Sequence, residues 1–291
     1  EAALAGKDII WDQNYKYNLT VRKTLEAIVS SYKGNKTSED WKKFMVYAKR
    51  VWFSNGIHHH YSNGKFTPDC SKEYFAELVK NSNAASLPVN QGENAEAFTK
   101  RITPIIFDMS VAPKKVNLDP KFDLVGASAT NFYEGVTEKE VSAFYKEMAD
   151  KNPGEFVRTD STDKTAGVYT QMSFGLNSKL MKENGKLVEK VWKLGGMYSA
   201  AIEKILYWLE KASTVAENPA QKKALDLLIA FYKTGDLKKF DEYCIAWVED
   251  TESAIDVVNG FIEVYGDPLA RKGSYESVVS VKDMEASKRI A

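Results

Sequence analysis

The sequence predicts an α+β protein that is mainly helical and has a small antiparallel β part. Amphipathic segments, with capping residues and apolar side chains spaced three and four apart, recur along the chain. The period changes in the middle, where Lys179 to Lys182 and Lys186 to Trp192 flank the hairpin signal Asn184-Gly185. A chain of 291 residues is long enough to bury a sizeable core.

Composition narrows the function classes. Lys+Arg and Asp+Glu balance at 40 each, so no excess of basic residues points to nucleic acid or a membrane surface, and neither partner is expected. No apolar run approaches the roughly 20 residues that a spanning helix needs. The two cysteines, Cys70 and Cys244, form no CxxC and no framework, which favours a reducing, cytoplasmic compartment.

Four helices are expected in the first 110 residues. Thr20 caps the first, which carries apolar residues to Tyr32, and Thr37 caps the second in a pattern resembling a capping box. The third covers 71–80. The fourth opens at Asn94 and ends before Pro104, because a proline disfavours helical backbone in the residue before it.

The later elements follow from the same signals. Thr137 with Glu140 is a capping box, and the helix behind it ends at 152–154. Weak alternation suggests a strand over 127–134, and 168–174 is rich in β-forming residues. Three amphipathic helices are then expected to pack together, over 198–216, from Pro219 behind the cap Asn218, and from Asp236 to about 249.

All three histidines, His58 to His60, lie in one loop over 58–68. Three adjacent rings rarely converge on one ion, because neighbours on a strand or helix point in different directions, so a metal site is disfavoured. A turn with exposed imidazoles is one alternative. A loop of aromatic and polar side chains bordering a peptide cleft fits better.

The stretch 255–268 organises the chain. Its first half is β-branched apart from Asp256 and Asn259, which suits a strand, and Asn259-Gly260 interrupts the run. Gly266-Asp267-Pro268 then turns the chain. An extended segment with a glycine-relieved kink and one carboxylate has the geometry needed to add a peptide as a further strand.

Several blocks resemble one peptidase family. They are NGFIEVYGDPL with the following SYESVVS, FMVYA with the following VWFSNGIHHHYSNGKFTP, NFYEGVT at 131–137 and GLNSKL at 175–180. Together they resemble the bacterial branch of the dipeptidyl peptidase III family, zinc peptidases that remove dipeptides from the N-terminus of oligopeptides. The resemblance spans most of the chain.

The resemblance also implies an organisation. Residues 1–280 would be the lower, substrate-binding lobe of a two-lobed fold, with a small barrel-like sheet to which chain beyond residue 291 contributes. Residues 281–291, which read as a helix, would begin the connection to a zinc-binding lobe of the same polypeptide. The family's HExxGH motif is absent, so no catalytic residue, metal ligand or cofactor is assigned here, and zinc is expected only in a full-length parent.

The implied substrate is an oligopeptide. The resemblance makes Asp256 the carboxylate for the peptide's α-ammonium, with backbone contacts from Val257, Val258 and Asn259. Tyr61, or its neighbour His60, would wall the pocket for the N-terminal residue. Asp256 could instead cap or pair at a strand edge, and Glu263 and Glu276 are either cleft residues or ordinary surface acids. A non-catalytic peptide-binding or interaction module is the alternative function.

Overall fold

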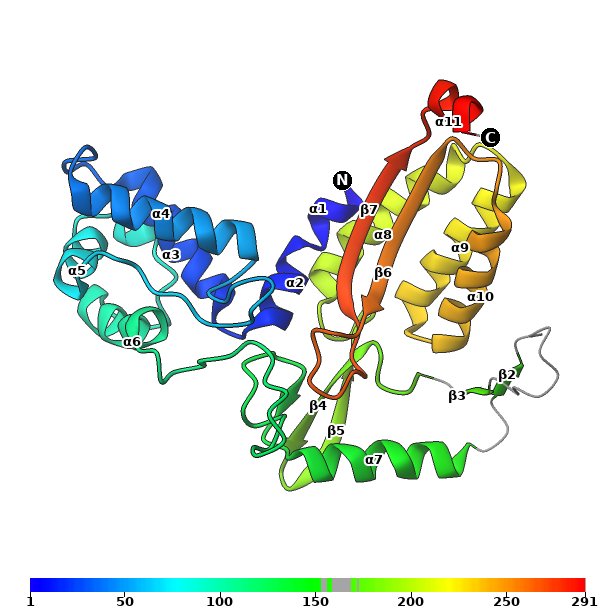
Figure 1. The fold of residues 1–291 in the computed structure, drawn as a ribbon, viewed down its shortest axis with the longest axis horizontal. Coiled ribbons are helices and arrows are strands. Elements are labelled where there is room, and N and C mark those ends of the chain that lie inside the picture. The colour runs from blue at the N-terminus through cyan, green and yellow to red at the C-terminus, as the bar shows by residue number, and fades with distance from the viewer. Residues whose placement is uncertain (153–155, 159–168, 172, 291) are drawn as a thin grey trace. The chain divides into compact units, whose positions relative to one another are not determined.

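The computed structural model describes residues 1–152, 156–158, 169–171 and 173–290 (Figure 1). The chain forms two compact units. Residues 10–131 make the helical unit, and residues 1–9 with 132–291 make the mixed unit. The division falls inside helix α2 (Lys7–Asn14).

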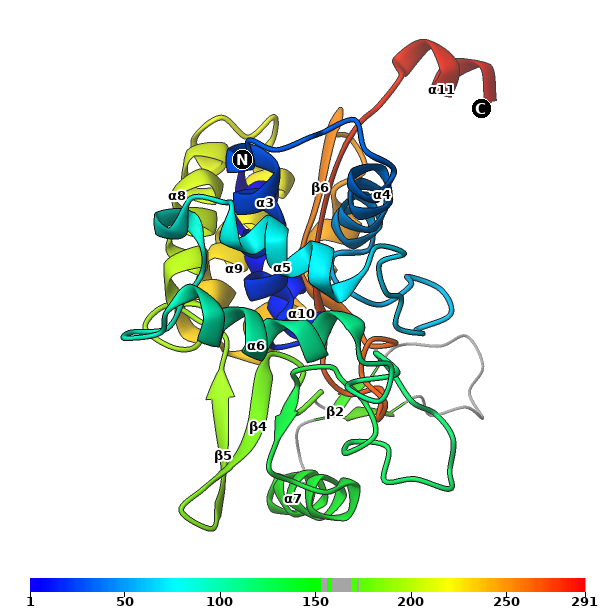
Figure 2. The ribbon, with the colours of Figure 1, turned by 90° about the vertical axis from the view of Figure 1, so that its left-hand side faces the viewer.

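Four longer helices build the helical unit, and Figure 2 shows them from one side. They are α3 (Asn18–Ser31), α4 (Glu39–Ser54), α5 (Lys72–Lys80) and α6 (Ala95–Phe107), with a short 3₁₀ turn at Ala84–Ser86. Their inward faces form one apolar core, which includes Trp11, Leu25, Ile28, Phe44, Val51, Phe75, Leu78, Phe98 and Ile102. This core confirms the helical periodicity read from the sequence.

Two of the predicted helix starts are wrong. α3 begins at Asn18, two residues before the expected cap Thr20, because the buried Asn18 amide bonds the Trp11 carbonyl and the Ile57 N–H. α4 is capped by Ser38, whose hydroxyl accepts the Trp41 N–H. The Thr37 hydroxyl is engaged by Asn35 in a local turn and is not free to cap.

The predicted end of the fourth helix is also wrong. α6 runs through Pro104 to Phe107. A proline inside a helix costs about 3 kcal/mol because it removes a hydrogen bond and crowds the preceding turn. Here the last turn buries Ile105 and Ile106, and burying such side chains contributes roughly 1.5–3 kcal/mol each, enough to offset that cost.

The mixed unit combines helices with three small sheets. β1 (Tyr133–Glu134) lies parallel to β4 (Ser178–Glu183), which pairs antiparallel with β5 (Lys186–Val191). β2 (Phe156–Arg158) pairs with β3 (Tyr169–Gln171), and β6 (Ile255–Glu263) with β7 (Ser274–Val281). Its helices are α1 (Ala2–Ala5), α7 (Glu138–Lys151), α8 (Ser199–Thr214), α9 (Pro219–Thr234), α10 (Leu237–Glu249) and α11 (Met284–Ile290).

Most of the local predictions for this unit are confirmed. Asn184 and Gly185 both have positive φ and join β4 to β5 as a two-residue hairpin. Thr137 and Glu140 form the capping box of α7, and α9 packs against both α8 and α10. The strand expected over 127–134 shrinks to the two residues of β1. Residues 153–154, 168 and 172 of the predicted turn and β-rich stretch lie outside the described residues.

The β6–β7 ribbon lies along α8 to α10 (Figure 1). Phe261 of β6 is fully buried, with its ring 4.8 Å from that of Trp192. β6 continues through Asn259-Gly260, so the predicted interruption there is wrong. Gly260 instead packs closely against a helix, because a Cβ at this position would lie 2.9 Å from the Phe240 ring.

In the described part of the chain, no helix combines the length and apolar character needed to cross a membrane.

Candidate functional site

In the helical unit, the loop over residues 57–66 is anchored at its base. His58 is buried, and its Nε2 lies 2.7 Å from the Ala112 carbonyl, while burial lowers the pKa of its ring to about 4. The buried Lys65 ammonium donates to the carbonyls of Asp108 and Val111 at 2.5 and 2.9 Å. His58 is therefore a neutral structural residue that donates from Nε2, and the loop base is fixed to the segment 108–112.

The tip of the same loop has its own support. His59 Nδ1 accepts the backbone N–H groups of Tyr61 and Ser62 at 3.3 and 3.2 Å, so its proton sits on Nε2. The His60 ring lies edge-on to Tyr61, with 4.8 Å between the ring centroids. Tyr61 is 83% exposed. The predicted pair His60 and Tyr61 therefore lies together at the surface, presented by a braced loop.

This loop tip and α4 enclose a groove of about 740 Å³, which we call the α4 groove. It lies wholly within the helical unit. Its residues are aromatic, apolar, basic or neutral polar, with no acid among them: Val46, Lys49, Arg50, Phe53, Ser54, His59, His60, Tyr61 and Phe66. The groove can therefore offer a ligand aromatic surface and positive charge.

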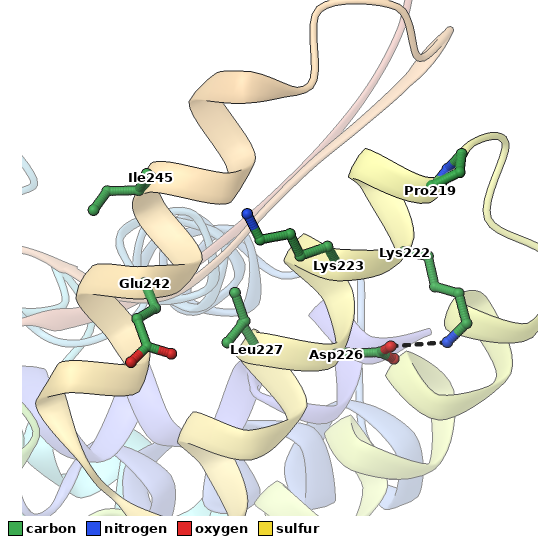
Figure 3. A pocket seen from close by; sticks show the side chains of 7 residues that line it. All are labelled: Pro219, Lys222, Lys223, Asp226, Leu227, Glu242 and Ile245. Carbon is green, nitrogen blue, oxygen red and sulfur yellow. Dashed lines mark hydrogen bonds and ion pairs between the residues drawn. The ribbon is translucent and has the colours of Figure 1, made fainter.

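A hollow of similar size lies in the mixed unit between α9 and α10, and Figure 3 shows its lining. Its volume is about 710 Å³. All its charges are neutralised locally by three ion pairs: Lys222 with Asp226, Lys223 with Glu249 and Glu242 with Lys239. A hollow whose charges are already paired has little to offer a charged ligand, which separates it from the α4 groove.

The donor set does not suit a zinc ion. Zinc in proteins takes three or four ligands from His, Cys, Asp or Glu, and the described residues contain no cluster of three such side chains placed to hold a metal. The three adjacent histidines have three different sets of partners. We therefore derive no chemistry through zinc from these residues.

In the mixed unit, Asp256 lies exposed on β6, and its Oδ1 accepts the Trp247 indole N–H at 2.7 Å. The neighbouring Val257 carbonyl accepts the Tyr243 hydroxyl at 3.3 Å. The Ile255 carbonyl accepts the Gln221 amide at 2.8 Å. Side chains thus occupy part of the β6 edge on which the sequence suggested that a peptide could add as a strand.

Asn259 points into the core. Its carbonyl oxygen accepts the Tyr232 hydroxyl, and its amide donates to Tyr275 and Ser277 at 3.1 and 2.9 Å. The side chain is fully buried. The resemblance implied a ligand contact from the backbone of Asn259, and this backbone also hydrogen-bonds the Tyr243 hydroxyl.

A bulge at the C-terminal end of β6 re-aims one carboxylate. Phe261 pairs with Tyr275, but Glu263 pairs with Ser274, so Ile262 is the extra residue. Without it, Glu263 would share the core-facing side of Phe261. With it, Glu263 shares the face of Glu276, as bulges beside functional sites often do.

Glu263, Glu276 and Tyr265 together form what we call the acid end of β6. Partial burial and the nearby Glu263 charge raise the pKa of Glu276. Burial, with the charges of Glu276 and Glu263, raises the pKa of the Tyr265 phenol. A cation bound beside Glu276 would offset the burial and the Glu263 charge that raise the pKa of Glu276.

The turn after the acid end is held by one buried carboxylate. Asp267 accepts the Tyr133 hydroxyl at 2.8 Å and the backbone N–H groups of Leu269, Arg271 and Lys272 at 3.1, 2.9 and 2.8 Å. These four hydrogen bonds to one buried carboxylate fix the turn. The position of Tyr265, two residues earlier, depends on this turn.

Lys272 ties the same turn to the sheet β1–β4–β5. Its side chain is fully buried, and its ammonium donates to the Tyr145 hydroxyl and, at 3.1 Å, to Ser178. Both hydroxyls donate to the Glu189 carboxylate at 2.6 Å. Burial lowers the pKa of Lys272 to about 7, although Glu189 favours its charged form.

The predicted site residues thus fall into two sets, one in each unit. His60 and Tyr61 lie together in the helical unit, and Asp256 to Asn259 follow one strand of the mixed unit. Sequence reasoning missed Tyr265, and it ranked Glu263 and Glu276 below Asp256. The bulge that unites these three side chains leaves one trace in the sequence, Gly273, where a Cβ would lie 2.6 Å from the Phe261 carbonyl.

Comparisons with known proteins point to one family. A model of peptidase family M49 matches residues 102–291. Dipeptidyl peptidase 3 of Rattus norvegicus is 22% identical over 271 residues, which are 86% of this chain and 35% of the rat protein. The Homo sapiens protein is 22% identical over 260 residues, which are 84% of this chain and 34% of its own length.

Solved structures show the same fold. DPP III from Caldithrix abyssi matches with a TM-score of 0.58 at 19% identity, over 99% of this chain and 39% of that one. Dipeptidyl-peptidase III from Corallococcus sp. strain EGB matches with a TM-score of 0.57 at 16% identity, over 100% and 38%. This chain therefore spans little more than a third of the proteins that it resembles, and its predicted α+β fold of the DPP III type is confirmed. Since the family model covers more than half of the chain, the protein belongs to peptidase family M49, the dipeptidyl peptidase III family.

Proposed function

We propose that residues 1–291 are the peptide-binding part of a dipeptidyl peptidase III-like zinc exopeptidase, which releases dipeptides from the N-terminus of oligopeptides. Residues 1–280 form the substrate-binding lobe, and 281–291 begin the connection to a zinc-binding lobe of the same polypeptide. The chain covers 34–35% of the rat and human relatives, which leaves room for such a lobe. Since no zinc ligands gather among the described residues, the zinc and its chemistry belong to that lobe. We place the enzyme in the cytoplasm.

The acid end of β6 is the observation that carries this proposal. An exopeptidase that counts residues from a free N-terminus must hold the α-ammonium, and a carboxylate pair does so by charge-assisted hydrogen bonds. Glu263 and Glu276 share one face of the ribbon, next to the exposed phenol of Tyr265. The raised pKa of Glu276 indicates a site that gains from a bound cation.

Asp256 is the competing anchor. It is exposed and keeps one carboxylate oxygen beyond the one that accepts the Trp247 N–H. Backbone groups of Val257, Val258 and Asn259 would then contact the peptide. We favour the acid end because the Asp256 carboxylate already accepts a hydrogen bond from the Trp247 indole. Glu276 instead lies near a second negative charge, that of Glu263, which a bound ammonium would offset. The resemblance assigned His60 and Tyr61, in the helical unit, to the pocket for the N-terminal side chain, and that assignment stays a prediction.

The test compares a short peptide with a free N-terminus and the same peptide acetylated, each titrated into residues 1–291 by calorimetry. A charge-assisted contact of about 1.5 kcal/mol predicts roughly tenfold weaker binding of the acetylated peptide. Equal affinities would remove the N-terminal anchor from the proposal.

The alternative is a peptide-binding module without chemistry of its own. Dipeptidyl-arylamide turnover and metal analysis of the purified 291-residue chain bear on it. We expect neither turnover nor stoichiometric zinc from this chain, since the HExxGH motif is missing. If a longer polypeptide that includes these residues also fails to cleave arylamides with zinc present, the module becomes the better account.

A further inference from the structure

The α4 groove offers aromatic and cationic side chains that are not part of the acid end of β6, the proposed anchor for the N-terminus of a peptide. Phe53 and Tyr61, on its two sides, are each 83% exposed, and Val46 is 45% exposed. Single exposed apolar side chains are common, but several large ones around one groove mark a binding surface. The groove volume of about 740 Å³ lies within the range of sites that hold side chains or small ligands.

α4 builds this surface from a second stripe. Trp41, Phe44 and Val51 face the core, whereas Val46, Lys49, Arg50 and Phe53 follow one another at i, i+3, i+4 and i+7. That spacing places the four side chains on one outward face. Two cations therefore lie between two apolar residues along a single helix.

The cations of this stripe have no acid of their own. Within the part of the chain that the structure describes, no ion pair involves Lys49 or Arg50, and no acid lines the groove. Earlier on the same helix, Lys42 pairs with Glu39 at 2.6 Å and Lys43 with Asp40 at 3.9 Å. The α4 groove thus presents unneutralised positive charge beside exposed aromatic rings.

We propose that the α4 groove binds a peptide segment in which an acidic side chain stands next to an aromatic one. The carboxylate contacts Lys49 and Arg50, whose guanidinium can bind it through two N–H groups. The aromatic ring packs between Phe53 and Tyr61, where aromatic pairs add to simple burial. The groove thereby sets a preference for an acidic side chain next to an aromatic one. That the ligand is a peptide rests on the proposed function.

The test uses tetrapeptides blocked at both ends, so an N-terminal ammonium cannot contribute. The probe Ac-Gly-Glu-Phe-Gly-amide is titrated into residues 1–291, with binding followed by NMR. The comparison peptides replace its glutamate by lysine or its phenylalanine by serine. We expect the probe to bind at least tenfold tighter than either, and to weaken as salt rises from about 50 mM to about 500 mM.

Charge-reversed variants assign the site. Lys49→Glu with Arg50→Glu is expected to weaken the probe at least tenfold. Lys42→Glu with Lys43→Glu changes the net charge equally on the same helix and is expected to change affinity less than twofold. Phe53→Ser should also weaken the probe, and Leu118→Ser, another exposed apolar residue of the helical unit, should not. All these side chains are solvent-accessible, so circular dichroism should show an unchanged fold.

Three results would overturn the proposal. The first is binding of the probe that does not saturate up to about 10 mM, which would mean a Kd above the millimolar range. The others are equal binding of the glutamate and lysine peptides, and equal losses of affinity in the two double variants. Each leaves the N-terminal anchor standing, because blocked peptides do not engage it. Conversely, equal affinities of free and acetylated peptides at the acid end leave the groove standing.

Discussion

The α4 groove and the acid end of β6 present opposite charges by different means. In the groove, the cations come from the regular spacing of one helix, and the aromatic wall comes from a loop braced by His58 and Lys65. At the acid end, the two carboxylates come together only because a bulge breaks the regular alternation of β6. A periodic element places side chains predictably, whereas an irregular one places them through tertiary contacts.

The two regions also differ in how far substitution of their supporting residues should lower stability. The acid end is followed by a turn held by a buried carboxylate and a buried ammonium, Asp267 and Lys272. Buried charges are strongly destabilising when a partner is lost. The mixed unit should therefore be sensitive to single changes near its acid end, while the exposed stripe of α4 should tolerate substitution.

The largest effect is expected from Asp267→Asn. An amide cannot accept the four donors that the carboxylate accepts, so the Tyr133 hydroxyl and backbone N–H groups lose partners. We expect the free energy of unfolding to fall by about 3 kcal/mol. Denaturant unfolding followed by tryptophan fluorescence measures it. Asp256→Asn, an exposed control on the same ribbon, should change it by less than about 0.5 kcal/mol, and equal losses would contradict the account.

Gly273→Ala tests the bulge itself. Its Cβ would lie 2.6 Å from the carbonyl carbon and oxygen of Phe261, so the backbone of β6 must shift. We expect a loss of about 2 kcal/mol in unfolding free energy, and exchange broadening of Glu263 and Tyr265 in NMR spectra. The matched change Gly64→Ala meets only ordinary contact, 3.6 Å from Ser62 Oγ, and should be nearly neutral. A well-tolerated Gly273→Ala would show that the bulge does not need the glycine.

Lys272 gives the mixed unit a pH dependence. Burial holds its pKa at about 7 in the folded state, below the 10.5 of an ordinary lysine. Below pH 7 both states are protonated and the cost of burying the charge applies in full. Between these two pKa values the unfolded state binds more protons, so stability rises with pH.

Lys272→Met removes that contribution. We compare the unfolding free energy of the wild type with that of Lys272→Met. Between about pH 7 and about pH 9.5, this difference should shift in favour of the wild type by about 1–2 kcal/mol. Parallel denaturant titrations at several pH values measure the shift, and Lys186→Met controls for losing a surface lysine. Identical pH profiles of wild type and Lys272→Met would show that the buried ammonium does not titrate in this window.

The smallest expected effect is a change of one pKa. Glu263→Gln removes the negative charge beside Glu276, so the raised pKa of Glu276 should fall toward the value of an ordinary glutamate. Carbon-detected NMR of the side-chain carboxyl groups follows it directly. Glu285→Gln in α11 serves as the control and should leave Glu276 unchanged. An unchanged Glu276 in the Glu263→Gln variant would mean that the two carboxylates are not close.

Sequence reasoning was most reliable where structure is local. The hairpin at Asn184-Gly185, the capping box of Thr137 and the three packed helices α8 to α10 depend on residues close in the chain, and all are confirmed. It failed where distant contacts decide. Asn18 starts α3 early because it bonds Trp11 and Ile57, and α6 passes Pro104 because its last turn buries isoleucines.

The same division holds for the candidate site. His60 and Tyr61 were found from a local loop together with the family resemblance, and the structure presents them together at the surface. Asp256 was ranked first because the family resemblance assigns the peptide's α-ammonium to it. The acid end was ranked lower because sequence periodicity cannot predict a bulge. The bulge in β6 goes with the close approach of Gly273 to Phe261, two residues that are twelve apart and lie on either side of a turn.

The acid end of β6 is the proposed anchor for the N-terminus of a peptide. The most direct measurement is calorimetry with a free and an acetylated peptide on three proteins: wild type, Glu263→Gln with Glu276→Gln, and Asp256→Asn. We predict that the roughly tenfold preference for the free peptide disappears in the double variant and persists in Asp256→Asn. A preference that survives in the double variant and disappears in Asp256→Asn would contradict the claim and place the anchor at Asp256.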